Sequence, residues 1–282
     1  MTERPFVTLA LDGVEFRLAT PADLSFIREY GRVFRVFDDN DSGNISFGLD
    51  DGNRKLFIKL AGAETVNAGS SPDDAVALLR RATTVYRDIV HPNIVRCVAT
   101  IDRAPYFGLV FEWVDGELLR RIYDECFTRF RSLPVPERLA VMDTIMTVMQ
   151  DIHDVGYVAV DVYDASFLYD FDRKHLTLCD IDVFERRPMV NTMGHMWGST
   201  RFMSPEEFER GAVIDEITNV YTLGAVAFLL FGDERTRTLS GWDAGESLFA
   251  VAHRATQDDR TKRFPGISAF AHAWRQAQQN MA

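Results

Sequence analysis

Two kinds of hydrophobic periodicity divide the chain near residue 114. Over residues 7–113, apolar residues alternate with polar ones or form short runs between turn signals, which predicts a meander of strands. From residue 118 onward, apolar residues recur every three or four positions, which predicts helices. One helix is also expected in the first part, from Ser71 to Ile89, because serine is a preferred N-cap and the apolar residues that follow it have helical spacing. The pattern therefore predicts an α+β chain, with a β-rich first part that carries one main helix and a longer, mainly helical second part.

Composition narrows the functional classes. The chain has 282 residues, of which 46% are hydrophobic and 26% are charged, as in ordinary globular proteins. Its net charge of −11 argues against nucleic acid or an anionic membrane as a partner. Its three cysteines lie far apart in apolar settings, and no run of about 18 apolar residues exists. We therefore expect reduced thiols, no membrane span and a cytoplasmic protein, whose oligomeric state the sequence does not indicate.

The segment from Gly156 to Glu185 carries the candidate chemistry. Two β-rich runs, Tyr157–Val162 and His175–Cys179, are expected to pair on either side of a turn. Such a pairing would bring Asp161 and Asp180 to the same end of the structure. Neighbouring carboxylates repel each other unless a cation or a shared proton lies between them, and a base beside a metal-binding acid is the arrangement that phosphoryl transfer uses. The alternative is that both residues are surface acids at strand ends.

The spacing of these residues resembles the catalytic loop and the metal-binding loop of the protein kinase family. Asp161 and Ser166 stand where the pattern H-R-D-x-K-x-x-N has its aspartate and asparagine, and residues 180–182 stand where the family has D-F-G. By this resemblance Asp161 is the catalytic base, while Asp180, Ser166 and Asp182 are the metal-facing residues. The residues that differ from the family pattern around the base are Ala159, Val160 and Tyr163.

The first lobe resembles the small lobe of the same family. Lys59 lies in Phe57-Ile58-Lys59, which corresponds to the Ala-x-Lys strand, so its ammonium group is expected to bind the phosphates of ATP and take part in catalysis. The alternative is a lysine on the solvated face of an edge strand. The turn at residues 38–44 corresponds to the glycine-rich loop that binds phosphates, and only Gly43 fits that pattern.

The helix predicted after Ser71 lacks the glutamate that pairs with the strand lysine in kinases. Counting back from the His91-Pro92-Asn93-Ile94-Val95 connector places Ala82 at that position, and helical periodicity makes Ala82 a core residue. Glu64 and Asp74 are two possible substitutes for the missing glutamate.

Residues 109–119, LVFEWVDGELL, resemble the segment that connects the two lobes of a kinase. By that resemblance Phe111 lies at the back of the adenine pocket, Glu112 and Val114 offer backbone groups to the base, and Glu117 reaches the ribose. The alternative is an edge strand that runs into a capped helix.

Two motifs of the second lobe make the resemblance specific. GSTRFMSPEE at residues 198–207 is similar to the segment that closes a protein kinase activation loop, and it places Ser199 beside the catalytic aspartate. DDRTKRFPGI at residues 258–267 is similar to the element that carries an arginine near the C-terminus. A buried glutamate needs a cation, so the family pattern predicts an ion pair between Glu206 and Arg263.

The resemblance extends from about residue 26 to residue 275. It implies a hairpin extension at residues 1–25 packed on the small lobe, a small lobe at residues 26–113 and a large lobe at residues 114–282, with nucleotide between the lobes. The implied activity is transfer of the γ-phosphate of ATP, with Mg²⁺, to a hydroxyl group of a protein substrate. Because Val160 replaces the arginine before Asp161, activation-loop phosphorylation is not expected to be required.

Two other readings of the sequence stay open. One is a pseudokinase that acts as a nucleotide-binding or scaffold module for a protein partner. The other is a kinase of small molecules, because the metal motif of those enzymes also lacks the glycine of D-F-G.

Overall fold

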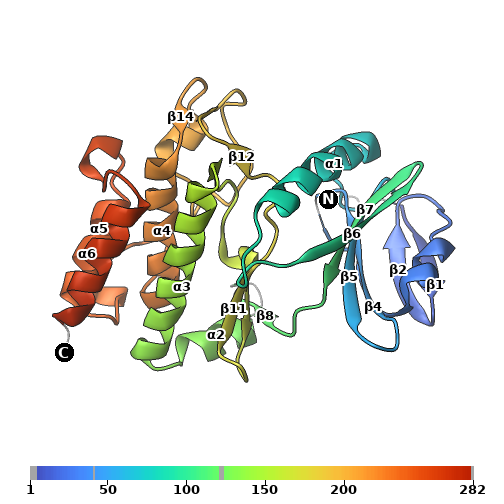
Figure 1. Cartoon of the computed structure of the whole chain (residues 1–282), viewed down its shortest axis with the longest axis horizontal. Coiled ribbons are helices and arrows are strands. Elements are labelled where there is room, and N and C mark those ends of the chain that lie inside the picture. The colour runs from blue at the N-terminus through green and yellow to red at the C-terminus, as the bar shows by residue number, and fades with distance from the viewer. Residues whose placement is uncertain (1–4, 41, 121–123, 281–282) are drawn as a thin grey trace. The chain divides into compact units, whose positions relative to one another are not determined.

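The computed structural model describes residues 5–40, 42–120 and 124–280 (Figure 1). Its contacts divide the chain into a first unit, Met1–Val90 with Val95–Val114, and a second unit, His91–Ile94 with Asp115–Ala282. The connector at residues 91–94 belongs with the second unit because the carbonyl of Asn93 accepts a hydrogen bond from the Leu178 amide at 2.7 Å.

A five-stranded antiparallel sheet forms the centre of the first unit. In spatial order its strands are β3 (Arg32–Phe37), β4 (Ile45–Asp50), β5 (Lys55–Ala61), β7 (Tyr106–Glu112) and β6 (Cys97–Arg103). The meander of strands that the periodicity predicted is confirmed. Helix α1 (Pro72–Asp88) begins after Ser71, whose hydroxyl accepts a hydrogen bond from the Asp74 amide at 3.2 Å, so the predicted N-cap is confirmed as well.

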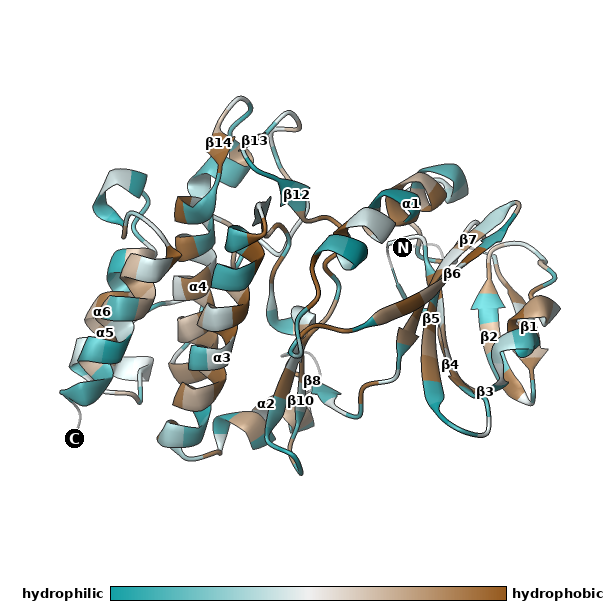
Figure 2. Ribbon diagram, viewed as in Figure 1, coloured by the Kyte–Doolittle hydropathy of each residue, from teal (hydrophilic) through white to brown (hydrophobic). Residues whose placement is uncertain are grey.

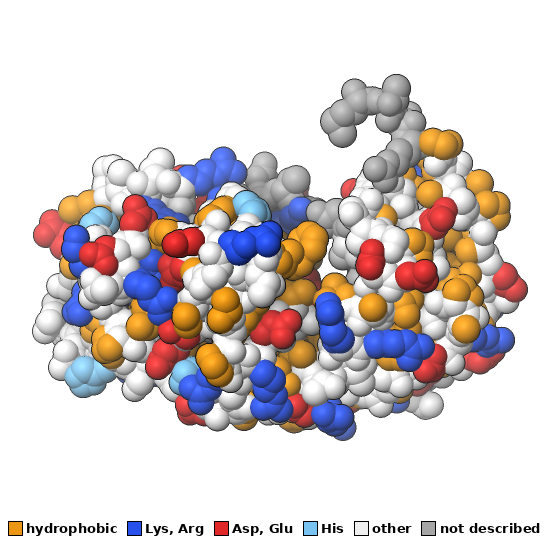
Figure 3. Space-filling view, turned by 90° about the horizontal axis from the view of Figure 1, so that it is seen from above, with side chains coloured by type: hydrophobic (Ala, Val, Ile, Leu, Met, Phe, Trp, Pro, Cys, Tyr) orange, Lys and Arg blue, Asp and Glu red, His pale blue; other side chains and the backbone are white. Residues whose placement is uncertain are grey.

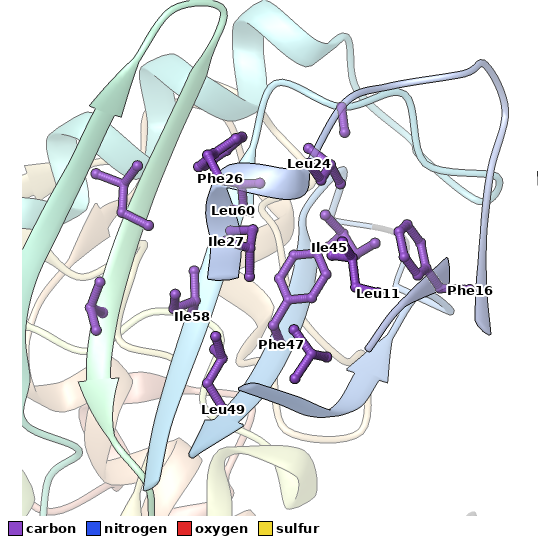
Figure 4. Packing of buried hydrophobic residues seen from close by; sticks show 14 of the residues in the cluster. Leu11, Phe16, Leu24, Phe26, Ile27, Ile45, Phe47, Leu49, Ile58 and Leu60 are labelled. Carbon is purple, nitrogen blue, oxygen red and sulfur yellow. The ribbon is translucent and has the colours of Figure 1, made fainter. Parts of the chain in front are cut away.

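An N-terminal segment covers one face of this sheet (Figure 4). It consists of the hairpin β1 (Val7–Leu11) and β2 (Val14–Leu18) and the 3-10 helix η1 (Ser25–Tyr30). A hairpin extension was predicted within residues 1–25, and Asp12-Gly13 forms its turn. Residues 26–30 lie in the range that the periodicity predicted as strands, but they belong to η1. Phe16 of the hairpin packs edge-on against Phe47 of β4, with ring centroids 6.0 Å apart, and Ile27 of η1 is fully buried in the same cluster. Burying each such side chain contributes about 1.5–3 kcal/mol, so this segment is an integral part of the core of the first unit.

The second unit is built around helix α4. Its helices are α2 (Asp124–Arg131), α3 (Val135–Asp154), α4 (Glu216–Phe231), α5 (Glu246–Ala255) and α6 (Ile267–Gln279). Helix α4 packs against α3, α5 and α6, and its residues from Thr218 to Phe231 are all buried. Hydrophilic residues appear on α3, α5 and α6 beside hydrophobic ones, as amphipathic outer helices require (Figure 2). Gly224 permits the close approach to α5, because a Cβ at this position would lie 2.8 Å from the Cβ of Ala255.

Short strands and 3-10 helices complete the second unit. The strands are β8 (Glu117–Leu118), β9 (Tyr157–Val158), β10 (Phe167–Asp170), β11 (His175–Leu178), β12 (Glu185–Arg186), β13 (Met189–Val190) and β14 (Val213–Ile214). The 3-10 helices are η2 (Asp164–Ser166), η3 (Pro205–Phe208), η4 (Leu239–Gly241) and η5 (Arg260–Lys262).

The predicted pairing of residues 157–162 with residues 175–179 is wrong. Strand β11 pairs with β10, which the sequence had placed in the turn, while β9 pairs with β12. The first run stops early because η2 follows it and the backbone of Asp161 is left-handed. The hairpin turns beyond Asp170, whose carboxylate accepts hydrogen bonds from the Asp172 and Arg173 amides at 3.0 and 2.9 Å and so closes the turn locally.

On the face shown in Figure 3, acidic and basic side chains are interspersed with apolar ones rather than gathered by sign. Within residues 5–40, 42–120 and 124–280, no helix has the length and apolar content that crossing a membrane requires.

Candidate active site

The loops that carry Asp161 and Asp180 meet at one end of the β10–β11 hairpin. Asp161 lies just before η2, which leads into β10, and Asp180 follows β11 after Cys179. The Cys179 amide donates a hydrogen bond to the carbonyl of Ser166 at 2.8 Å, which ties the two loops together. The sequence thus placed both acids at the same end of a hairpin, although with the wrong first strand.

Both aspartates have left-handed backbones. The φ angle is +59° at Asp161 and +61° at Asp180. Residues other than glycine adopt this conformation at a cost, and aspartate and asparagine tolerate it better than most because their side chains are short and polar. Sparsely populated backbone conformations persist where the surrounding structure holds them and tend to cluster at functional sites.

Ser166 and Tyr163 shape the loop after Asp161. The buried Ser166 hydroxyl accepts a hydrogen bond from the Tyr163 amide at 3.2 Å and donates one to the carbonyl of Asp161 at 3.5 Å. The hydroxyl is thus part of the loop's internal hydrogen bonding, and its role as a metal ligand stays a prediction. Burial raises the pKa of the Tyr163 phenol, and the negative charges of Asp180 and Asp161 raise it further. The phenol is therefore a neutral hydroxyl in the field of both carboxylates.

Asp180 and Asp182 occupy different environments within the metal motif. Asp180 is exposed, whereas Asp182 is buried beside Ile181, which is fully buried. The Ile181 carbonyl accepts a hydrogen bond from the Phe184 amide at 3.2 Å, so the motif ends in a tight turn. The carboxylate of Asp180 is thus in contact with solvent, and the metal-facing roles of both acids stay predictions.

Asn219 of α4 holds the backbone just before Asp161. Its Oδ1 accepts a hydrogen bond from the Ala159 amide at 3.0 Å, and its Nδ2 donates one to the Ala159 carbonyl at 2.6 Å. Asn219 is 2% exposed, so both bonds are shielded from water. An amide can serve one donor and one acceptor at once, which a carboxylate cannot. Asparagine can therefore serve both groups of Ala159, a role that the sequence pattern did not reveal.

The GSTRFMSPEE segment lies against Asp161 through Gly198. A Cβ built on Gly198 would lie 3.5 Å from Oδ1 of Asp161 and 3.1 Å from Sδ of Met203, and its φ angle is +144°. The next residue, Ser199, was predicted to lie beside the catalytic aspartate. Its hydroxyl accepts a hydrogen bond from Nε of Arg201 at 3.3 Å. Glycine is required here because a side chain would be strained by the backbone conformation and crowded by its neighbours.

The predicted ion pair between Glu206 and Arg263 is confirmed. The guanidinium of Arg263 donates from Nη1 and Nη2 to the two oxygens of Glu206, at 2.7 and 2.9 Å, and its side chain is fully buried. The Thr218 hydroxyl donates a third hydrogen bond to Glu206 at 3.0 Å. Burial is the largest single influence and would raise the pKa of Glu206, but the hydrogen bonds and charge of Arg263, a backbone hydrogen bond and the hydrogen bond from Thr218 together outweigh it and hold the pKa below its ordinary value.

The neighbouring Glu207 has the opposite shift. Its pKa is raised to about 7, mainly by burial and to a smaller extent by the charge of Glu206. The Ser204 amide and hydroxyl, which donate hydrogen bonds to Oε2 of Glu207 at 2.6 and 2.9 Å, act in the opposite direction. Between about pH 4.5 and pH 7 the folded chain therefore holds a proton that the unfolded chain releases. The contribution of Glu207 to the free energy of unfolding is full below this window and falls as the pH rises through it.

Glu207→Gln is expected to remove this pH dependence. The free energy of unfolding of the wild type, taken relative to that of the variant, should fall by about 2 kcal/mol between pH 5 and pH 7.5. Urea denaturation of both proteins across this range measures the difference. Exposed Glu209 supplies the control, because Glu209→Gln should leave the pH profile of stability unchanged. Parallel profiles for Glu207→Gln and the wild type would contradict the shift.

In the first unit, Lys59 lies on the central strand of the sheet. Strand β5 pairs on both sides, so that Lys59 stands opposite Ser46 of β4 and Leu109 of β7. The edge-strand alternative is therefore wrong. Leu56, Ile58 and Leu60 of β5 face the N-terminal segment, which places Lys59 and Phe57 on the other face of the sheet.

That second face of the sheet is rich in aromatic residues. Phe57 stands where the family has a small alanine, and its ring centroid lies 5.8 Å from that of Phe37 and 6.3 Å from that of Phe111. Phe111, at the predicted back of an adenine pocket, packs edge-on against Tyr86 of α1 at 4.8 Å. Lys59 thus shares its sheet face with a group of rings that the motif comparison had not indicated.

Helix α1 is placed as the periodicity predicted. Ala82 is fully buried in the core, so the helix offers no acid at that position. Of the two possible substitutes, Asp74 accepts a hydrogen bond from the Ser71 hydroxyl at 2.7 Å and so belongs to the helix cap. Glu64 is exposed, and its carbonyl accepts a hydrogen bond from the Ala19 amide at 2.8 Å.

The acidic turn at residues 38–44 is held by contacts within the first unit. Asp38 accepts hydrogen bonds from the Arg17 amide at 2.7 Å and from Nε of Arg17 at 3.2 Å. Asp39 accepts one from Nδ2 of Asn67 at 2.5 Å. Buried Gly43 packs closely enough that a Cβ there would lie 3.0 Å from the Ser70 hydroxyl. Asp38 and Asp39 of the turn therefore both have hydrogen-bond partners, and Arg17, the partner of Asp38, belongs to strand β2 of the N-terminal hairpin. Asp41 lies outside the described residues.

The segment that resembles the kinase connector is not an edge strand. Strand β7 pairs with both β5 and β6, so that alternative is wrong. The Glu112 amide donates to the carbonyl of Arg96 at 3.0 Å, and its carboxylate pairs with Arg96 at 2.9 Å. Val114 is half-buried at the end of the first unit. Glu117, in β8 of the second unit, pairs with Arg129 at 3.1 Å.

Comparison with known proteins gives the family. The model of the protein kinase domain matches residues 53–264, which is more than half of the chain. The chain therefore belongs to the protein kinase family, and its strand order and helical second unit agree with the two-lobed α+β fold of that family.

Several kinases are similar to this chain at low identity. Serine/threonine-protein kinase 1 of African swine fever virus (isolate Pig/Kenya/KEN-50/1950) is 24% identical over 142 residues, which are 50% of this chain and 46% of the viral protein. Serine/threonine-protein kinase RUNKEL of Arabidopsis thaliana is 22% identical over 151 residues, which are 51% of this chain and 10% of that protein. Mitogen-activated protein kinase kinase kinase 1 of Homo sapiens is 22% identical over 163 residues, which are 56% of this chain and 10% of the human protein. The chain thus spans less than half the length of each of these relatives.

Proposed function

We propose that this chain is an ATP-dependent phosphotransferase that uses Mg²⁺ and transfers a phosphoryl group to a serine or threonine hydroxyl of a protein. The observation that carries the proposal is the meeting of the Asp161 and Asp180 loops, tied by the hydrogen bond from Cys179 to Ser166. The names of the viral and plant relatives support the choice of a serine or threonine.

The residues fit this activity by their chemistry. Carboxylate oxygens are ligands that Mg²⁺ prefers, and exposed Asp180 offers them, with Asp182 and the Ser166 hydroxyl as further oxygen donors of the motif. Asp161 would accept the proton of the attacking hydroxyl. Bound Mg²⁺-ATP would supply the phosphoryl group and neutralise the charge that develops during its transfer.

The first unit would contribute nucleotide-binding groups. The ammonium group of Lys59 would bind the α- and β-phosphates, and Gly43 would let the turn approach them. The carbonyl of Glu112 and the amide of Val114 would bind the adenine, because the Glu112 amide already donates to Arg96 within the sheet. Glu117 would bind the ribose after release from Arg129.

A scaffold function without phosphoryl transfer is the second candidate. It is favoured by buried Ala82, which leaves α1 without the acid that pairs with the lysine in kinases, and by Phe57, whose ring lies on the Lys59 face of the sheet. Both features would weaken nucleotide binding, so a binding measurement separates the two candidates.

Calorimetric titration with ATP in the presence and absence of Mg²⁺ tests the metal site. The wild type should bind ATP more tightly with Mg²⁺, and Asp180→Asn should lose this gain, with affinity about tenfold weaker or more, because one carboxylate ligand is removed. Asparagine is chosen because it tolerates the left-handed backbone. Asp172→Asn, in the exposed turn of the same hairpin, is the matched control and should bind as the wild type does.

Phosphoryl transfer itself then decides the role of Asp161. Under single-turnover conditions Asp161→Asn should slow transfer by about 10²-fold or more, since it removes the proton acceptor. A wild type that binds no ATP, with or without Mg²⁺, would select the scaffold function. Equal transfer rates in the wild type and Asp161→Asn would refute the catalytic assignment.

A further inference from the structure

Arg201 lies at the centre of a buried ion network in the second unit. Its Nη2 donates to Oδ1 of Asp164 at 2.8 Å, and its Nη1 donates to Oε1 of Glu234 at 2.8 Å. The side chains of both acids are 1% exposed. Asp164 begins η2, three residues after Asp161, and Glu234 follows α4. One guanidinium group therefore joins the GSTRFMSPEE segment to the loop of Asp161 and to the end of the central helix.

A second arginine reinforces this connection. Arg237 donates from Nη2 to the carbonyl of Arg201 at 2.8 Å, from Nη1 to the Tyr221 hydroxyl at 2.7 Å and from Nε to the carbonyl of Glu234 at 3.1 Å. Its φ angle is +49°, a conformation that costs free energy for such a residue and that these three bonds hold in place. Both the side chain and the backbone of Arg201 are thus fixed.

The network is selective for arginine at position 201. Two buried carboxylates, Asp164 and Glu234, need a cation that reaches both, and a planar guanidinium with diverging N–H groups does so where a single ammonium cannot. Burial would lower the pKa of Arg201, but its hydrogen bonds and charge interactions with these acids outweigh burial and raise it. Removing the guanidinium would take from both buried acids a cation within 2.8 Å, which is costly in the interior.

We propose that Arg201 is a positioning residue, which holds residues 198–203 and the loop of Asp161 together without a phosphorylated side chain. Gly198 lies against the carboxylate of Asp161, and Asp164 lies three residues after Asp161 in its loop. By pairing Arg201 with Asp164, the network joins the segment of Gly198 to that loop. Val160 stands where kinases carry an arginine before the catalytic aspartate. In this chain Arg201, from residues 198–203, connects that segment to the Asp161 loop instead. The consequence for catalysis rests on the function proposed above, whereas the structural role does not.

Hydrogen exchange of the full chain tests the structural role. In Arg201→Gln, amides at residues 161–167 and 198–203 should exchange about tenfold faster or more, while those of α4 keep their protection. Asp164→Asn should expose the same two segments, and Arg201→Lys, which retains the charge but reaches one acid, should be intermediate. Arg210→Gln is the matched control, because Arg210 is an exposed arginine of the same region. If Arg201→Gln does not fold, Arg201→Lys and Asp164→Asn carry the same comparison.

Two further measurements complete the test. A Thr192→Val/Thr200→Val variant, which removes two exposed hydroxyl groups of this region, should exchange as the wild type does. Unchanged exchange at residues 161–167 in the Arg201 and Asp164 variants would overturn the proposal, as would loosening of both segments in the threonine variant. In single-turnover transfer from Mg²⁺-ATP to casein, Arg201→Gln should lower the rate about tenfold at unchanged ATP affinity, and Arg201→Lys should restore part of it. A wild type without transfer would refute the proposed function alone, since the exchange data decide on Arg201 independently.

Discussion

Arg263→Met is expected to lower the free energy of unfolding by about 3–5 kcal/mol at pH 7, because it leaves the buried Glu206 carboxylate without its cation. The Thr218 hydroxyl would remain as a partner but carries no charge. The loss should shrink as the pH falls, since a Glu206 freed from Arg263 would take up a proton more readily than in the wild type. Urea denaturation at pH 7 and pH 5 measures both effects.

Two controls separate the buried charge from the lost packing. Glu206→Gln combined with Arg263→Met should recover part of the stability, because no uncompensated charge remains. Arg260→Met is the control, because Arg260 and Asp215 also form contacts of 2.8 Å but their side chains are about a third exposed. This variant should lower the free energy of unfolding by at most about 1 kcal/mol. A similar loss for Arg263→Met and Arg260→Met would show that burial does not govern the Glu206–Arg263 pair.

Asn219→Asp is expected to destabilise this chain by about 2–3 kcal/mol at neutral pH. A carboxylate could still accept the hydrogen bond from the Ala159 amide but would face the Ala159 carbonyl without a proton to donate. Thermal and urea unfolding would measure the loss, which should diminish in acid as the new carboxyl group becomes protonated. Asn53→Asp, in an exposed turn, changes the same atoms in water and serves as the control.

The predicted loss at Asn219 has a clear counter-outcome. If Asn219→Asp were as stable as the wild type at pH 7, the amide bond to the Ala159 carbonyl would contribute little, and the asparagine would need another explanation. Because Ala159 lies two residues before Asp161, a folded Asn219→Asp protein should also show faster hydrogen exchange in that loop.

The sequence predicted those parts of the fold that depend on local patterns or on well-spaced motifs. The helix start at Ser71 follows from capping chemistry, and the Glu206–Arg263 pair follows from two motifs that are meaningful only together. The hairpin of β10 and β11 was misplaced because residues 157–162 are as β-rich as residues 167–170. Strand propensity could not show that a left-handed Asp161 and η2 interrupt the first run.

Other features escaped prediction because they join residues that no motif relates. Arg17 neutralises Asp38 across 21 positions, and Arg201 reaches Asp164 and Glu234 across 37 and 33. Polar residues of this kind appear in a sequence as ordinary surface charges, since nothing local indicates that folding will pair them. Spacing indicated the candidate base and metal ligand, whereas the network of Arg201 with Asp164 and Glu234 required coordinates.

The left-handed backbones at Asp161 and Asp180 have an evolutionary consequence. At both positions glycine would relieve the backbone cost that an aspartate bears, so selection for stability alone would favour loss of the carboxylates. Asp161→Gly and Asp180→Gly are therefore expected to relieve this backbone cost. In the function proposed above, the two carboxylates are what the chain would gain in return for that cost.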